Sequence, residues 1–335
     1  MVKPDQRTTD PDPTRTDLNR ARVTSVINGK GGVLKTSLTA NLGGEMARRG
    51  FTVLIIDLDI SGNLKLDIGM RDPERDDHGR SIVDAIWSDK PLEPVRDAGG
   101  RPGLHFIFGG RVLDMVGYLA TSSNGDLLPS GSAAEQFAKA LGDLCAREEY
   151  DFVLIDCPPG NGELQEVALM ASRYVLIPTK TDEASLDGLR GVGPRVRKTR
   201  DLNPGLSYLG VVITSHNRAA SRILREVQGR LGEVGDTLAL FTSTIRHSQA
   251  AAHDCRTRGQ LAYELAKDAT KQREQRFAAL KARRRRSDGD ATVIPLPAAI
   301  TATADDLAGD YEALVDEILT RVAADENATA GEGSR

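Results

Sequence analysis

The residues best suited to chemistry lie in the stretch NGKGGVLKTS, residues 28–37. A phosphate-binding loop reads G-x-x-x-x-G-K-[ST]; here Gly29 opens that pattern, and Lys35 and Thr36 close it. In such a loop the backbone N–H groups bind phosphate, the lysine contacts the β- and γ-phosphates, and the hydroxyl ligates Mg²⁺. The pattern predicts a nucleotide-binding segment made of Gly29, Lys30, Gly31, Gly32, Val33, Leu34, Lys35, Thr36 and Ser37.

Two further stretches place carboxylates directly after apolar runs. VLIIDLD carries Asp57 and Asp59, and FVLIDCPPG carries Asp156. A hard cation such as Mg²⁺ prefers oxygen ligands and keeps several waters, and Asp156 suits the role of holding that hydrated metal. A single aspartate after a strand is often only a turn residue or a helix cap. Three of them beside a glycine loop indicate a site for a nucleotide and Mg²⁺.

The elements that must position these residues follow from the hydrophobic pattern. Apolar runs occupy residues 23–27, 51–57, 104–108, 151–156, 174–178 and 209–214. They are continuous and rich in β-branched residues, which is typical of strands buried on both faces. Longer amphipathic segments separate them, so the sequence predicts a doubly wound, mostly parallel α/β sheet with helices on both faces. Ligands of such sheets bind beyond the carboxyl ends of the strands, where the glycine loop would lie.

Four stretches in this order, GKGGVLKTS, IIDLDISGNL, LIDCPPG and LIPTKTDEASLDGL, resemble the ParA/MinD family of deviant-Walker P-loop ATPases, over residues 23–265. Lys30 is the most specific likeness, because the family loop reads K-G-G-x-x-K-[ST]. The resemblance implies an ATPase that dimerises around two ATP molecules, with Lys30 reaching the nucleotide of the other subunit. It also implies that Asp59 orients the attacking water, and that Thr36, Asp57 and Asp156 lie on the Mg²⁺ side.

Two positions depart from the family pattern. Leu34 stands where glycine is common, and residues 60–63 read Ile-Ser-Gly-Asn where the family usually has Pro-Gln-Gly-Asn. A leucine in left-handed backbone geometry costs about 1–2 kcal/mol, and we expect its side chain to crowd the phosphate. These departures predict slow ATP hydrolysis, and the resemblance implies that a partner and DNA stimulate it.

Charge points to a polyanionic partner. The chain of 335 residues has a net charge of −4, yet residues 267–286 hold nine Lys or Arg and two acids. Such a run either neutralises DNA phosphates or is only a solvated helix face. The resemblance favours non-specific binding of double-stranded DNA and partitioning of plasmid, phage or chromosome DNA with a ParB-like centromere-binding partner. The candidate DNA-binding residues are Arg218, Arg222, Arg246, Lys281, Arg283, Arg284, Arg285 and Arg286.

We expect five segments along the chain. These are a disordered tail (1–20), the ATPase domain (21–266), a basic helix and linker insertion (267–303), a C-terminal helix packed on the ATPase domain (304–324) and a second disordered tail (325–335). No apolar run approaches a membrane span, and the polar N-terminus lacks the apolar region of a signal peptide. The three cysteines are not spaced as pairs, so we expect reduced thiols in a cytoplasmic protein associated with the nucleoid.

Other functions of the same fold remain open. A MinD-like positioning ATPase would need a basic amphipathic helix at its C-terminus, whereas the last helix here is acidic. An iron–sulfur relative would need bridging cysteines, and Cys157 suits a small buried residue instead. A tyrosine kinase of this fold would need a C-terminal tyrosine cluster, which the sequence lacks. A weakly hydrolysing ATP-binding scaffold is a further alternative.

Overall fold

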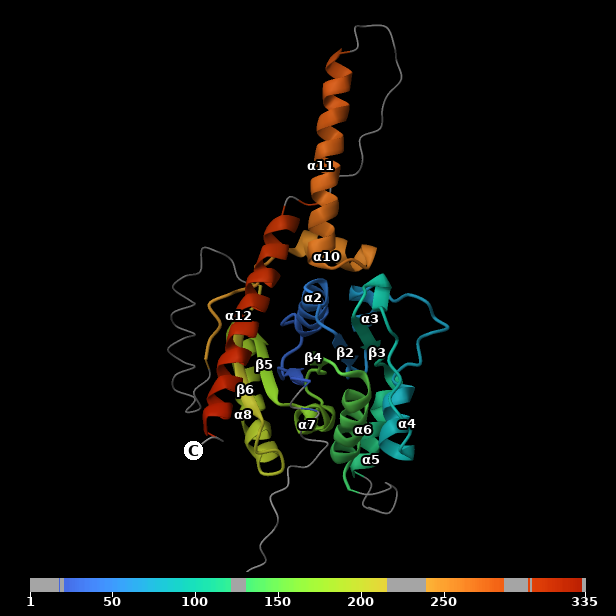
Figure 1. Ribbon diagram of the computed structural model, residues 1–335, viewed down its shortest axis with the longest axis vertical. Helices are drawn as coiled ribbons and strands as arrows, with labels where there is room; N and C mark the ends of the chain where they lie inside the picture. The colour runs from blue at the N-terminus through green and yellow to red at the C-terminus, as the bar shows by residue number, and fades with distance from the viewer. Residues whose placement is uncertain are drawn as a thin grey trace, which may run out of the picture.

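A single parallel sheet forms the centre of the molecule (Figure 1). The computed structural model describes residues 18, 21–121, 131–215, 239–285, 301 and 303–332. Within these residues six strands pair in the order β3-β2-β4-β1-β5-β6, and every pairing is parallel. The strands are β1 (Thr24–Val26), β2 (Val53–Asp57), β3 (Leu104–Ile107), β4 (Phe152–Asp156), β5 (Tyr174–Thr179) and β6 (Ser207–Ile213). The predicted fold class and all six predicted strands are confirmed.

Both faces of the sheet are covered, which explains why the strand sequences are continuously apolar. Along β2, Val53 and Ile55 enter one apolar cluster, whereas Leu54 and Ile56 enter another on the opposite face. The first cluster is completed by α2 (Lys35–Arg48), α3 (Leu64–Asp67), α10 (Gln249–Arg258), α11 (Ala262–Arg285) and α12 (Ala304–Glu332). The second is completed by α4 (Arg80–Ser88), α5 (Asp114–Thr121), α6 (Ala133–Glu148), α7 (Gly162–Ala171) and α8 (Glu183–Arg200).

Helix α12 is longer than expected and is anchored along its length. The sequence predicted a disordered tail from residue 325, but α12 continues to Glu332. The reason is tertiary: Asp325 accepts hydrogen bonds from Arg173 and Tyr174, and Glu326 pairs with Arg22. None of these partners lies near residue 325 in sequence, so local patterning could not reveal them.

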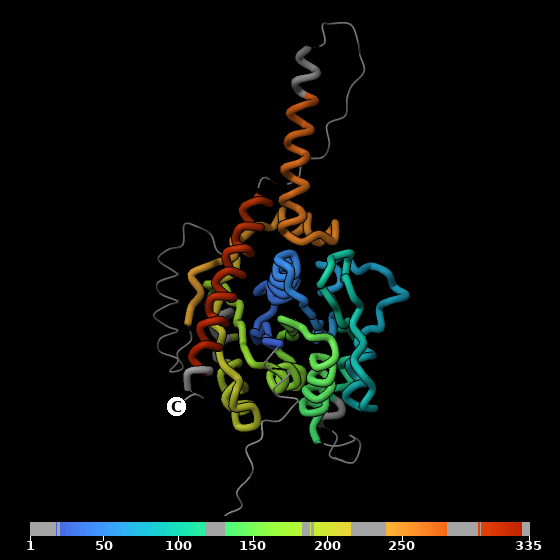
Figure 2. The backbone as a smooth tube through the Cα atoms, in the orientation of Figure 1, coloured from blue at the N-terminus to red at the C-terminus, as the bar shows by residue number. Residues whose placement is uncertain are grey.

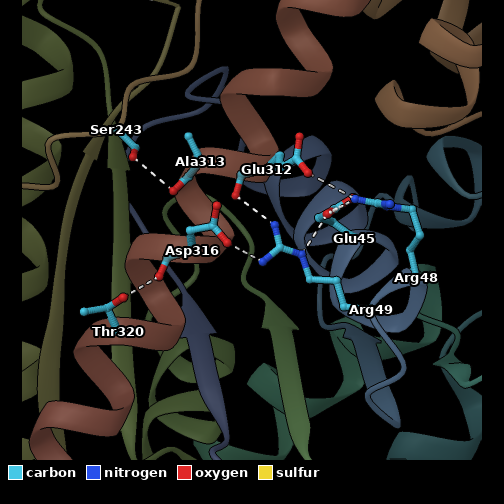
Figure 3. Close-up of polar contacts among 8 residues, drawn as sticks. All are labelled: Glu45, Arg48, Arg49, Ser243, Glu312, Ala313, Asp316 and Thr320. Carbon is cyan, nitrogen blue, oxygen red and sulfur yellow. Dashed lines mark hydrogen bonds and ion pairs between the residues drawn. The ribbon is translucent and has the colours of Figure 1, made fainter.

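Nearer the N-terminus of α12, two arginines at the C-terminal end of α2, Arg48 and Arg49, contact the acidic face of α12 (Figure 3). Arg49 pairs with Asp316 at 2.5 Å and also donates to the carbonyl of Glu312 at 3.2 Å. Leu314, Val315 and other apolar residues of α12 are buried beneath these ion pairs. Helix α12 is therefore packed into the core of the same domain as α2.

Helix α11 projects away from the rest of the molecule (Figures 1 and 2). Its first turns are buried, with Leu265 and Ala269 in the core, whereas Phe277 is 71% exposed. The domain boundary expected between residues 266 and 267 falls inside this helix, which runs unbroken from Ala262 to Arg285. Of the remaining expected segments, residues 1–17 and 286–300 lie outside the described residues. None of the described helices is long and apolar enough to cross a membrane.

Candidate nucleotide site

The glycine loop connects β1 to α2, in the predicted strand–loop–helix context. Gly32 has φ = 74° and Leu34 has φ = 64°, so the chain turns through left-handed geometry twice before the helix begins. Leu34 is the N-cap of α2, and its side chain caps no N–H group. The first backbone N–H groups of α2 are therefore left for an anion, as at other helix N-termini that bind phosphate.

Three residues outside the predicted set brace this loop. Asn28 is fully buried; its amide donates to the Pro178 carbonyl at 2.8 Å, and its oxygen accepts from the Lys30 N–H at 2.8 Å. Thr214, just after β6, donates to the carbonyl of Val33 at 3.0 Å. Gly188 of α8 lies so close that a Cβ there would be 2.2 Å from the Asn28 oxygen. A glycine inside a helical pattern is the one sequence signal that could have marked this contact.

The two loop lysines have different environments. Lys35 is 6% exposed, and its ammonium donates to the backbone carbonyl of Lys30 at 3.0 Å. Burial lowers the pKa of Lys35, although the nearby Asp156, Cys157 and Asp59 oppose that shift. Lys30 is exposed on the surface of the loop. The structure thus buries Lys35 against the inside of the loop and leaves Lys30 exposed.

The predicted acids meet at one edge of the sheet. Asp57 ends β2 and Asp156 ends β4, and these two residues are direct partners in the parallel register. Both oxygens of Asp57 accept backbone N–H groups, from Asp59 at 3.0 Å and from Leu64 at 3.0 Å. Asp59 is partly exposed and accepts the Ser61 N–H at 2.8 Å. Asp57 therefore shapes the loop, and Asp59 lies nearer to solvent.

Asp156 is the one of these acids that lacks backbone partners. It is fully buried, and neither oxygen accepts a hydrogen bond of normal geometry from the described residues. Burial raises the pKa of Asp156 well above its usual range; Asp57 adds to the shift, and the Thr36 hydroxyl and Lys35 ammonium oppose it. An orphaned buried carboxylate of this kind requires a partner that the protein itself does not supply.

These residues fit a hydrated Mg²⁺. Asp156 offers two free oxygens, and the Thr36 hydroxyl lies beside it. The described residues contain no cluster of three or more His, Cys, Asp or Glu suited to a metal. Mg²⁺ takes one or two protein ligands and completes its shell with phosphate oxygens and waters. Ser37 does not join this group, because its hydroxyl donates to Asp67 at 2.9 Å.

Leu34 differs in part from expectation. Its left-handed backbone is as predicted, but its side chain packs against the apolar cluster around α2. There it lines a cavity of about 490 Å³ together with Ser37 and Asn41 of the same helix. This location gives no support to the expected crowding of the phosphate, and the backbone strain remains. The cavity continues past Ser215, after β6, to Tyr311 of α12, and it has the size of a small-molecule pocket.

The candidate DNA-binding residues lie in different surroundings. The Arg246 guanidinium is bound to Asp310 at 2.6 Å and to Asp306 at 2.7 Å. These two ion pairs tie the loop before α10 to α12, and the predicted contact of Arg246 with DNA stays a prediction. Arg218, Arg222 and Arg286 lie outside the described residues. The backbone places Lys281, Arg283, Arg284 and Arg285 in the last turns of the projecting α11.

A parallel sheet with a glycine-rich loop at its carboxyl edge, a buried loop lysine and an acid on the neighbouring strand defines the class of P-loop nucleotide-binding proteins. Residues 21–208 match the family model described as an AAA domain. The chain is 29% identical to the chromosome partitioning protein ParA of Caulobacter vibrioides over 273 residues, which cover 78% of this chain and 98% of that protein.

Solved structures agree in fold. The cell division ATPase MinD of Pyrococcus furiosus superposes with a TM-score of 0.56 at 21% identity, covering 90% of this chain and 99% of that one. Cobyrinic acid a,c-diamide synthase of Mycobacterium smegmatis, solved with a bound ATP analogue and magnesium, gives a TM-score of 0.55 at 23% identity, covering 71% and 93% of the two chains. This chain belongs to the ParA/MinD family of P-loop ATPases.

Proposed function

We propose that this protein is a ParA-like ATPase that forms an ATP-sandwich dimer, binds DNA non-specifically and partitions DNA with a ParB-like partner. The observation that carries the proposal is the pair of loop lysines, with Lys35 buried in the site and Lys30 exposed outside it. An exposed lysine on the loop can reach the phosphates bound by a second copy of the chain. The relative from Caulobacter vibrioides, a chromosome partitioning protein, supports the same assignment.

Within each subunit the roles follow from position. Lys35 and the first backbone N–H groups of α2 bind the phosphates, because a cationic ammonium and the positive end of the helix lie together at the start of α2. Thr36 and Asp156 hold Mg²⁺, which when bound offsets phosphate charge. Asp59, partly exposed two residues after the end of β2, orients the attacking water. The cavity beyond Leu34 takes the base and ribose, because it begins at the same helix N-terminus.

DNA binding is assigned to α11. Before its last turns this helix already carries Lys267 and Lys271, both exposed, and it projects from the body (Figure 1). An α-helix fits the major groove of DNA, and each neutralised phosphate releases counterions. We assign to these basic residues the affinity for DNA that is independent of sequence.

Dimerisation tests the proposal directly. Light scattering coupled to size-exclusion chromatography would measure the mass of the protein with Mg²⁺-ATP, with Mg²⁺-ADP and without nucleotide. We expect a dimer only with ATP, and a monomer for Lys30→Ala under all three conditions. Lys139→Ala is the matched control, because that exposed lysine lies on α6, outside the loop, in surface pairs with Asp89 and Asp143. A dimer of Lys30→Ala with ATP would contradict the proposed role of Lys30.

A further inference from the structure

Helix α3 is bonded to the nucleotide site at both of its ends. It follows directly on the loop that carries Asp59. The N–H of Leu64 at its start donates to Asp57 at 3.0 Å, and Asp67 at its end accepts the hydroxyl of Ser37 at 2.9 Å. Ser37 is the residue after Thr36 in the phosphate loop. A shift of either the Asp59 loop or the start of α2 must therefore act on α3.

The far side of α3 touches the turn between α10 and α11. Gly69 and Gly259 meet there backbone to backbone: a Cβ on Gly69 would be 2.7 Å from the Gly259 carbonyl oxygen, and one on Gly259 would be 2.5 Å from the Gly69 Cα. Two such surfaces leave no free space between them. A displacement of α3 toward this turn would push the turn as well.

Arg101 joins the same two segments. Its side chain is 8% exposed; one nitrogen donates to the Ile68 carbonyl after α3 at 2.7 Å, and another donates to the Gly259 carbonyl at 3.2 Å. The guanidinium also forms a two-nitrogen pair with Glu264, in the first turn of α11, at 2.8 Å and 2.6 Å. One buried arginine thus holds the end of α3 and the base of α11 in a fixed relation.

We propose that Arg101 is a positioning residue. It couples the nucleotide state of the site, through α3, to the position of the first turn of the basic helix α11. This inference rests on the proposed function, since it concerns how ATP controls DNA binding. Its physical basis is a continuous set of short contacts from Asp57 through α3 to Glu264, in which every step is a hydrogen bond or a backbone contact. Coupling between two sites of this kind typically changes affinity by about 5–150-fold.

The test compares the DNA affinity measured with ATP and with ADP for a variant in which both charges of the Arg101–Glu264 pair are removed. Arg101→Leu/Glu264→Leu removes the ion pair without leaving one charge buried alone. The matched control is Arg173→Leu/Asp325→Leu, which removes another partly buried pair, at 2.8 Å, that joins α12 to the residue just before β5, away from α3 and α11. Fluorescence anisotropy on a random-sequence duplex measures the affinities, and ATP binding and turnover are measured beside them.

We expect wild type and control to bind DNA more tightly with ATP than with ADP. The Arg101→Leu/Glu264→Leu variant should lose that difference by about fivefold or more, while its ATP affinity and basal turnover remain near wild type. An undiminished difference in this variant would overturn the coupling and leave the proposed function intact. Equal affinities in ATP and ADP for wild type would instead overturn the proposed function, and the coupling with it.

A measurement on wild type covers the case in which the variant does not fold. Hydrogen–deuterium exchange would follow the backbone N–H groups of residues 255–269 with ATP and with ADP. We expect protection in this segment to change with the nucleotide, together with residues 64–70 of the α3 region. A change confined to residues 29–37, with no response at the α10–α11 turn, would overturn the inference.

Discussion

Asp156 makes the nucleotide-free site costly to fold. A buried carboxylate without hydrogen-bond donors lowers stability by about 1–3 kcal/mol, and Asp156 has no partner of normal geometry among the described residues. We expect Asp156→Asn to raise the free energy of unfolding of the nucleotide-free protein by at most about that amount, because the amide is still buried without a partner but carries no charge beside the Asp57 carboxyl. The same variant should lose the extra stability that Mg²⁺ adds in the presence of ATP. Urea denaturation with ATP, with and without Mg²⁺, measures both effects, and a less stable nucleotide-free Asp156→Asn would contradict this account.

The same acids give stability a defined dependence on pH. Burial raises the pKa of Asp57 to about 7 and that of Asp156 well above its usual range. A carboxyl with a raised pKa keeps its proton longer in the folded state, so between about pH 4 and pH 7 the folded state binds more protons than the unfolded state. The contribution of these groups is fully present below the unfolded pKa and is lost as pH rises through the folded pKa.

We therefore expect the nucleotide-free protein to become less stable as pH rises across that window. Denaturation at several pH values, with Asp156→Asn as the comparison, tests this expectation. The slope should be smaller in the variant, since one of the two carboxyls is gone. An equal slope in both proteins would mean that other groups set the pH dependence.

Leu34 is a second residue whose conformation predicts an effect. Its φ of 64° is unfavourable for a side chain with a Cβ, by about 1–2 kcal/mol. Leu34→Gly should relax the loop and raise ATP turnover, by at most the roughly tenfold that 1.4 kcal/mol represents, a limit reached if all of the relieved strain lowers the barrier to hydrolysis. Steady-state phosphate release measures the effect. Turnover that is unchanged or lower would show that the left-handed leucine does not limit hydrolysis.

At the scale of elements, α8 can approach the phosphate loop closely because the residue at the contact, Gly188, has no side chain. A Cβ at Gly188 would lie 2.2 Å from the side-chain oxygen of Asn28 and 3.1 Å from the backbone nitrogen of Lys30. We expect Gly188→Ala to displace the loop, costing about 1–3 kcal/mol and weakening ATP binding accordingly. Gly193→Ala in the same helix is the matched control, since its nearest new contact is an ordinary 3.6 Å to Arg197. Equal ATP affinities for the two variants, measured by calorimetry, would show that this contact has no effect on the site.

The sequence predicted the elements where one local pattern decides them. Continuous apolar runs marked all six strands, because burial on both faces leaves no polar positions. The glycine loop and its acids were equally readable, since their spacing is set by the strand ends. The extension of α12 beyond residue 324 was not readable, because it is held by Arg173 and Arg22, which are distant in sequence.

The same limit applies to the surroundings of Arg246. A lone arginine in a loop resembles a free cation in sequence, and only the fold brings Asp310 and Asp306 to it from α12. Gly188 and Thr214 were missed for the same reason, since each contributes through contact with a loop far away in the chain. Local spacing gives the chemistry of this site, and tertiary contacts decide which charges are available.

For the whole molecule, the prediction concerns how salt affects DNA binding. The chain is acidic overall, so any affinity for DNA must come from a local basic surface, and α11 is the projecting candidate (Figure 2). Deleting residues 281–286 removes five basic side chains from the end of this segment. We expect weaker binding of DNA and a shallower dependence of log affinity on log salt, by about 0.9 for each DNA phosphate that the shortened helix no longer neutralises. An unchanged isotherm would mean that this part of the helix is only a solvated surface.

The measurement closest to the central claim is fluorescence anisotropy of the wild-type protein on a random-sequence DNA duplex, with ATP, with ADP and without nucleotide, at two salt concentrations. The proposed function predicts binding that requires ATP and weakens with salt. Equal binding in all three states would contradict it, because the basic helix would then bind DNA independently of the nucleotide in the site. No binding in any state would contradict it as well, and ATP-dependent sedimentation with anionic liposomes would then favour a MinD-like role.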